Sequence, residues 1–238
     1  MTINVSLKEL VTSGAHFGHQ TRRWNPKMAQ YIYGNQDGVY LLDLIKTKEK
    51  LDEVLELLSN FAKDGKSILF VGTKKQANEK VKEVAESTGS FYVTERWLGG
   101  ALTNFDQIKS TTKRLTEMQT KLEIGEYNDR TKKERVVIQR EIDRLQRFFG
   151  GLVGLDKLPD LMVIVDTKRE FTAVREAINK GVTTVGIVDT NSDPTVVDYP
   201  IPMNDDATKA LSYVLGLMAE AIMEGKSVIK KETPKNDK

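Results

Sequence analysis

Cysteine is absent from the 238-residue sequence. This absence excludes disulfides, thiolate metal sites and cysteine nucleophiles. Long hydrophobic runs are absent too: the longest wholly aliphatic or methionine run is Leu161 to Val165, whereas a transmembrane helix needs about 20 residues. The N-terminus lacks the basic start, apolar core and small-residue cleavage site of a secretory signal. We therefore expect a cytoplasmic protein with one large α/β domain, or one domain with an insertion.

A large excess of charge of one sign is also missing, because 36 basic side chains face 34 acidic ones. The distribution along the chain is more informative than the total. Residues 1–50 carry seven basic and four acidic side chains, residues 104–150 eleven and eight, and residues 226–238 five and two. Three basic segments on a slightly acidic body suit contact with a polyanion. Excesses of this size also fit an ordinary solvated surface, so charge alone leaves nucleic-acid binding open.

Short apolar runs alternate with amphipathic segments along most of the chain. The runs predict strands at 67–72, 91–93, 161–165 and 183–188, and the amphipathic segments predict helices at 46–63, 74–87, 168–179 and 206–223. In the helix at 168–179 we expect Phe171, Val174 and Ile178 to lie on one face. Strand, helix and strand with short connections predict an α/β fold, a doubly wound parallel sheet with helices on both faces.

Residues 104–149 break this alternation. Apolar side chains step by three and four residues from Ile108 to Leu122 and from Ile138 to Phe149, and turn residues lie between the two series. This pattern predicts an inserted, protruding α-helical coiled-coil hairpin. Residues 1–103 and 150–225 would then form one domain, with a basic loop region at 1–45 packed on it, and the polar residues 226–238 would be a disordered basic tail.

Catalytic motifs are missing. No G-x-G-x-x-G follows a strand, and neither a phosphate-binding loop nor a G-x-S-x-G nucleophile elbow occurs. The two histidines, His16 and His19, could ligate a metal together with Asp189, Asp193 or Asp205, which lie near predicted strand ends. Alternatively, both histidines form local hydrogen bonds, and the aspartates cap turns and helices.

Two segments combine cations with aromatic rings. Residues 22–28 contain Arg22, Arg23, Trp24 and Lys27, and residues 94–105 place Arg96 beside Trp97. Guanidinium groups grip phosphates, and aromatic rings stack on bases or brace loops. The alternative is that the tryptophans are core residues and the cations are merely solvated. The predicted RNA-binding residues are Arg22, Arg23, Trp24, Lys27, Lys74, Lys75, Arg96, Trp97, Lys113, Arg114, Arg130, Lys132 and Lys133.

Seven stretches along the chain carry a family resemblance. They are LVTSGAHFGHQTRRWNPKM, YIYGNQDGVYLLDL, FVGTKKQA, RWLGGALTNF, DKLPDLMVIVDTKREFTAVREA, GIVDTNSDP and YPIPMNDDA. In this order they resemble the bacterial form of the S-two family of small-subunit ribosomal proteins. The resemblance covers nearly the whole chain, and only the hairpin interior and the tail are generic.

The resemblance implies a Rossmann-like, flavodoxin-like α/β/α domain with a protruding coiled-coil hairpin. It implies a non-enzymatic protein that binds small-subunit ribosomal RNA late in assembly, beside neighbouring ribosomal proteins, and that helps to dock the S-one protein in some bacteria. It also implies a single divalent metal, zinc or magnesium, near His19, Asp189 and Asp205.

Two other hypotheses stay open. One is a nucleotide- or metal-dependent enzyme with His16, His19 and Asp189 as its site. The other is a coiled-coil adaptor that holds another protein through residues 104–150.

Overall fold

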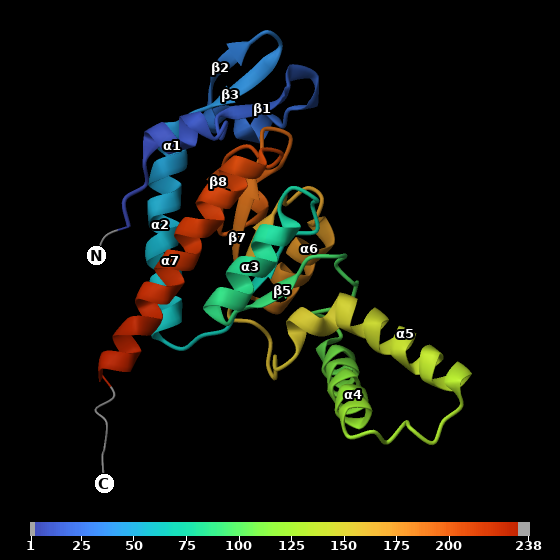
Figure 1. Cartoon of the computed structure of the whole chain (residues 1–238). Coiled ribbons are helices and arrows are strands. Elements are labelled where there is room, and N and C mark those ends of the chain that lie inside the picture. The colour runs from blue at the N-terminus through green and yellow to red at the C-terminus, as the bar shows by residue number, and fades with distance from the viewer. Residues whose placement is uncertain (1–2, 233–238) are drawn as a thin grey trace.

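The structure, a computed structural model, describes residues 3–232, with side chains described up to residue 227 (Figure 1). Its centre is a five-stranded parallel sheet in the order β5-β4-β6-β7-β8. The strands are β4 (Ile68–Val71), β5 (Phe91–Val93), β6 (Leu161–Val165), β7 (Thr183–Val188) and β8 (Tyr199–Pro202). The order of the first three strands reverses at β4, as in flavodoxin-like doubly wound sheets. The predicted α/β fold with a parallel sheet is confirmed.

The edge strand β8 has no counterpart among the predicted strands. Its sequence, YPIP, contains two prolines, which cannot donate to a strand ladder and so argue against a strand. An edge strand tolerates them, because only one of its sides pairs with a neighbour.

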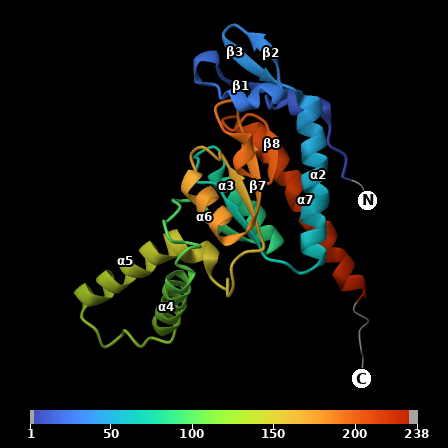
Figure 2. The same cartoon turned by 180° about the vertical axis from the view of Figure 1, so that it is seen from behind.

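Helices cover both faces of the parallel sheet (Figures 1 and 2). On one face lie α2 (Leu44–Lys63), α3 (Asn78–Thr88) and α7 (Thr208–Glu232), whose apolar side chains pack with Phe70, Val163 and Ile187. On the other face lies α6 (Phe171–Lys180), which packs with Leu69 and Met162. Alternate strand residues therefore feed two separate cores, as expected for a sheet buried on both sides.

Two helices differ from their predicted form. In α6 the buried face consists of Ala173, Val174 and Ala177, whereas Phe171 and Ile178 are 50% and 56% exposed. Small alanines let the helix lie close to the sheet, so the larger flanking side chains remain outside. Helix α7 continues through residues 226–232, part of the segment predicted as a disordered tail. The rest of that predicted tail, residues 233–238, lies outside the described residues.

The N-terminal region forms a small antiparallel sheet rather than a loop. Helix α1 (Leu7–Thr12) is followed by β1 (Phe17–Gln20), β2 (Ile32–Gln36) and β3 (Val39–Leu42), in the order β1-β3-β2. Asp37 and Gly38 connect β2 to β3 with positive φ angles of 51° and 78°. Asp-Gly is a strong signal for such a tight hairpin turn. A cluster of Met28, Tyr31 and Leu42 packs on Val188 and fixes the small sheet near the end of β7.

Helices α4 (Phe105–Glu123) and α5 (Lys132–Phe149) extend away from the parallel sheet (Figures 1 and 2). Leu115, Ile142 and Leu145 are buried between the two helices. Ile108, at the base of α4, belongs to the core beneath α6. Leu122, predicted on the same seam, is 40% exposed, so the buried contact is confined to the half of the pair nearest the sheet.

Within residues 3–232, no helix combines the length and the apolar character that crossing a bilayer requires.

Candidate functional site

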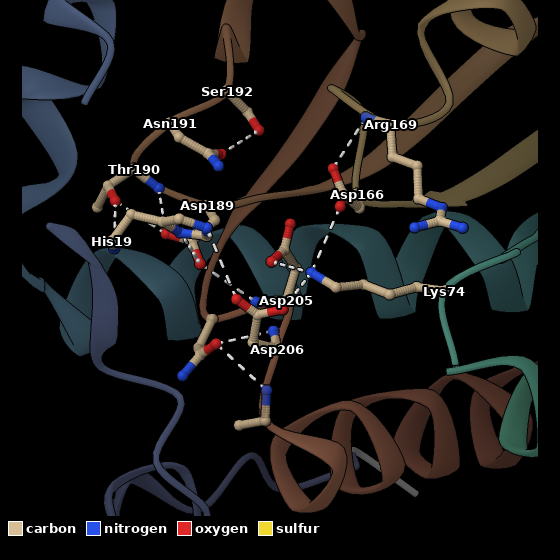
Figure 3. A network of polar contacts seen from close by, with 12 residues as sticks. His19, Lys74, Asp166, Arg169, Asp189, Thr190, Asn191, Ser192, Asp205 and Asp206 are labelled. Atoms are coloured by element: carbon tan, nitrogen blue, oxygen red, sulfur yellow. Dashed lines mark hydrogen bonds and ion pairs between the residues drawn. The ribbon is translucent and has the colours of Figure 1, made fainter. Parts of the chain in front are cut away.

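Charged side chains from five segments meet at the carboxyl edge of the parallel sheet (Figure 3). Asp166 follows β6 and Asp189 follows β7, while Asp205 and Asp206 lie between β8 and α7. Lys74 follows β4, and His19 comes from β1 of the small sheet. Carboxyl ends of parallel strands share one edge, and the reversal of strand order beside β4 makes this edge the usual binding position of doubly wound proteins. We call this group the switch-point cluster.

Lys74 is the centre of the ion pairs in the switch-point cluster. Its Nζ lies 2.7 Å from Asp205 Oδ1, 2.6 Å from Asp206 Oδ1 and 3.4 Å from Asp166 Oδ2. Burial alone would lower the pKa of Lys74, but the hydrogen bonds to Asp205 and Asp206 raise it. The side chain is buried and held by carboxylates. Lys74 is therefore not retained among the predicted phosphate contacts.

Both the backbone and the ring of His19 are held in place. Its backbone N–H donates to Thr190 Oγ1 at 2.7 Å, and its ring Nδ1 lies 3.1 Å from Asp189 Oδ2. A Cβ on the preceding Gly18 would overlap the Thr190 side chain, so this close approach requires glycine. The hydrogen bond to Asp189 is the main cause that raises the pKa of His19.

Carboxylates outnumber cations in the switch-point cluster, and the pKa of Asp205 reflects this. Its side chain is only 1% exposed, and burial, followed by the charges of Asp189 and Asp166, raises its pKa to about 7. Ligand atoms of His19, Asp205 and Asp206 all lie within 4.8 Å of one another. One imidazole and two carboxylates form a donor set that zinc accepts, and the carboxylates alone also suit magnesium. The residues present thus fit a divalent cation.

The predicted metal residues divide into two roles. His19 and Asp205 are candidate ligands, and Asp189 instead holds Nδ1 of His19, the usual arrangement for orienting a metal-binding histidine. Asp206 was not predicted, although it directly follows Asp205 in the sequence.

The other two candidates lie outside this arrangement. Nδ1 of His16 is buried and has no hydrogen-bond partner among the described residues. Asp193 caps a short 3-10 helix and pairs with Lys27. Neither residue therefore joins the three candidate ligands.

The first basic-aromatic segment presents two arginines to solvent. Arg22 and Arg23 are exposed on a short 3-10 helix, Thr21–Arg23, and Arg22 Nε donates to Gln20 Oε1 at 3.0 Å. Trp24 is half-buried against Tyr40, with ring centroids 5.1 Å apart. Lys27 is paired with Asp193 at 2.6 Å. The two arginines are thus the cations of this segment that carboxylates leave free among the described residues.

A buried glutamate that was not predicted as a functional residue holds the second segment in place. Glu176 of α6 is 6% exposed and accepts hydrogen bonds from Trp97 Nε1 at 3.1 Å and from the backbone N–H groups of Gly100, Leu102 and Thr103 at 2.8, 2.9 and 3.1 Å. Trp97 is only 7% exposed, so it braces this loop and its ring is not available for stacking. Arg96, next to it, is exposed.

The remaining predicted cations are all exposed. Arg114 lies 3.6 Å from Glu141 and Arg130 lies 4.0 Å from Glu134, both weak surface pairs. The other exposed cations are Lys75, Lys113, Lys132 and Lys133, which have no ion pair among the described residues.

The chain was matched to a known protein family over most of its length. The family described as Ribosomal protein S2 matches residues 10–225, which span the parallel sheet, the small sheet and the helical hairpin.

Proposed function

The chain belongs to the ribosomal protein S2 family, and on this premise we propose that it binds small-subunit ribosomal RNA by phosphate contacts at two separate surfaces. Members of this family are structural, non-enzymatic proteins of the small ribosomal subunit that act in translation. The enzyme hypothesis is therefore set aside. One surface is the small sheet with the adjoining loops, and the other is the helical hairpin.

The observation that carries this proposal is the set of exposed cations that lack carboxylate partners within residues 3–232. Arg22 and Arg23 lie at the small sheet, and Lys113, Lys132 and Lys133 lie on the hairpin. Cations that the protein does not neutralise are free to displace the counterions of a nucleic acid. Trp24 and Trp97 brace their loops, and Lys27 is a weaker candidate because Asp193 holds it. The proposed phosphate contacts are Arg22, Arg23, Lys75, Arg96, Lys113, Arg114, Arg130, Lys132 and Lys133.

The proposal includes a division of the chain into units. Residues 1–103 and 150–225 would form one α/β/α domain, and residues 104–149 an inserted coiled-coil hairpin. The burial of Leu115, Ile142 and Leu145 between α4 and α5 supports knobs-into-holes packing near the base.

Further parts of the proposal concern partners and place. We propose contacts with neighbouring small-subunit proteins and a cytoplasmic, ribosome-bound location. Docking of the S-one protein is included for organisms that possess it. The family assignment supports these three statements.

We also propose a divalent metal at the switch-point cluster, with His19, Asp205 and Asp206 as ligands. The excess of carboxylates around the single cation Lys74 supports it. The ion would supply positive charge that ties β1 to the segment before α7. Its role would be structural, since the family has no catalytic activity.

The test is sedimentation of a tagged copy with small subunits at low and high salt. We expect co-migration that weakens as salt rises, because each phosphate contact contributes about 0.9 to the slope of log K against log salt. In Arg22→Ala/Arg23→Ala the slope should fall by about two. Lys27→Ala, whose cation is already neutralised by Asp193, is the matched control and should change the slope less. A copy that stays at the top of the gradient at every salt concentration would refute the proposal.

A further inference from the structure

The distal end of the hairpin exposes apolar side chains. Ile124 is 70% exposed and Val137 58%, and Leu122 and Val136 are 40% and 43% exposed. The two helices diverge from their base toward this end (Figures 1 and 2). The buried contact of Leu115, Ile142 and Leu145 therefore ends before the tip is reached. Large apolar side chains exposed at the end of a projecting element are typical of an interaction surface.

A hollow lies beside one of these side chains, Val137. Its volume is about 350 Å³, within the range of roughly 300–1,000 Å³ that small-molecule sites occupy. Three of its six lining residues are charged, and the other three are Tyr127, Val137 and Ile138. The lining residues are Tyr127, Arg130, Lys133, Glu134, Val137 and Ile138. We call this feature the tip hollow.

The unpaired charge around the tip hollow is mostly positive: among the described residues 124–135, Asp129 is the one carboxylate without an ion pair, against three such cations. Lys132, Lys133 and Arg135 in the first turn of α5 have no ion pair among the described residues. The acidic group in the lining, Glu134, is already engaged: its Oε2 accepts from the backbone N–H and the hydroxyl of Thr131, each at 2.9 Å. Those hydrogen bonds lower the pKa of Glu134 and cap the helix. An occupant should therefore carry negative charge beside an apolar body.

An unpaired nucleotide has this combination of properties. A base offers a flat apolar face, and its phosphates offer the charge that the lysines and arginines lack. Base stacking on an aromatic ring needs no particular base identity, so one tyrosine in an apolar hollow is sufficient. An apolar protein segment would fill the hollow but would leave the cations unpaired.

We propose that the tip hollow binds one unpaired base of the small-subunit ribosomal RNA. The base stacks on Tyr127 and rests on Val137 and Ile138, while Arg130 and Lys133 contact the adjoining phosphates. This inference rests on the proposed RNA-binding function and adds a base contact to its phosphate contacts. It also assigns a role to the exposed end of the hairpin that a coiled-coil seam does not explain.

Photo-crosslinking identifies the occupant directly. The full chain carries benzoylphenylalanine in place of Val137, is bound to small subunits depleted of this protein, and is irradiated. We expect crosslinks to RNA. The same substitution at Val136, which is exposed but does not line the hollow, is the control and should crosslink much less. Crosslinks from position 137 to protein alone would overturn the inference.

Affinity for the depleted subunits separates this inference from the proposed function. We expect Tyr127→Ala to weaken binding about tenfold without changing the salt slope, because stacking releases no counterion. Lys133→Ala should lower the slope by about one, and Val136→Ser should match the unmodified chain. Helix content measured by circular dichroism should stay constant in all three variants.

The outcomes fall into distinct groups. If Tyr127→Ala binds as tightly as the unmodified chain, and both show the same salt slope, the base contact is refuted while the RNA-binding function stands. If the unmodified chain itself does not bind the depleted subunits, both proposals fail.

Discussion

The Asp206 carboxylate lies between the Lys74 ammonium group and the His19 ring in the switch-point cluster. Its Oδ1 lies 2.6 Å from Lys74 Nζ, and its Oδ2 lies 3.6 Å from Nε2 of His19 (Figure 3). The nitrogen of His19 that faces Asp206 is the one that Asp189 leaves free. A metal bound at this nitrogen would therefore find the Asp206 carboxylate already in place.

We predict that Asp206→Asn weakens zinc binding by tenfold or more, since it removes one of three ligands and its charge. Titration calorimetry with zinc alone measures the affinity. In the unmodified chain, zinc at one hundred times its Kd should add about 2.7 kcal/mol to the free energy of unfolding. Asp193→Asn is the matched control, because that aspartate lies outside the candidate ligands. Equal zinc affinities in the two variants would contradict the site.

The sequence predicted the neighbours of some residues in the switch-point cluster but not those of Lys74. His19, Asp189 and Asp205 were named through the family resemblance, and the structure brings them together. Lys74 was assigned to phosphate because a lysine after a strand resembles an anion site. Its true surroundings depend on which carboxylates the other strands bring to the same edge. These contacts depend on the tertiary fold, so the residues next to Lys74 in the sequence do not reveal them.

At the scale of elements, α6 fixes the loop that precedes the hairpin. Five donors from residues 97–103 converge on the Glu176 carboxylate, so a loop with two glycines acquires one conformation. Burial alone would raise the pKa of Glu176, but the hydrogen bonds from Leu102, Thr103, Gly100 and Trp97 together lower it. The carboxylate is therefore stabilised in its charged form.

We predict that Glu176→Gln lowers the free energy of unfolding at pH 7 by about 1.5–3 kcal/mol, because an amide nitrogen cannot accept these hydrogen bonds. The folded pKa of Glu176 lies below the unfolded value of about 4.3. Its contribution is thus fully present above that unfolded value and is lost as the pH falls through the folded pKa.

Urea denaturation at pH 7 and at about pH 3.5 measures both effects. The difference between the unmodified chain and Glu176→Gln should shrink at the lower pH. Glu56→Gln, an exposed glutamate on α2, should cost little at either pH. A Glu176→Gln chain as stable as the Glu56→Gln chain at pH 7 would contradict the assigned role.

Elements were predicted best where periodicity is strong and local. A short, wholly apolar run such as Leu161–Val165 is typical of a strand buried on both faces of a parallel sheet, so the sequence located β6 correctly. The small sheet was missed because its strands show no clean alternation and both of its strand pairings contain register shifts. In α6 the periodicity was read correctly, but the pattern does not tell which of two apolar stripes meets the sheet.

At the scale of the whole molecule, the switch-point cluster explains why this doubly wound sheet need not bind a nucleotide. Asp166, Asp189 and Asp205 occupy the edge where related folds hold phosphate. Their negative charge repels phosphate, and the small sheet packs beside the end of β7. The anionic edge thus suits cations, whereas the outer surfaces carry the exposed cations that we propose bind RNA.

This division predicts the behaviour of a chain with a shortened hairpin. Arg114 and Glu141 form an ion pair across α4 and α5, so a short glycine-serine linker can replace residues 117–140 while Leu115, Ile142 and Leu145 remain. We expect the thermal unfolding of this chain to stay close to that of the unmodified one, because both cores of the sheet lie outside the deletion.

Binding of the shortened chain to small subunits should weaken, and the salt slope should fall by about 0.9 for each lost contact, which here means Arg130, Lys132 and Lys133. The coiled-coil adaptor hypothesis predicts the reverse: a protein partner would be lost while RNA affinity and salt slope stay unchanged. Gradient sedimentation with partner analysis by mass spectrometry distinguishes the two. A shortened chain that binds with an unchanged slope would remove the hairpin from the RNA-binding surface and leave the small sheet as the main contact.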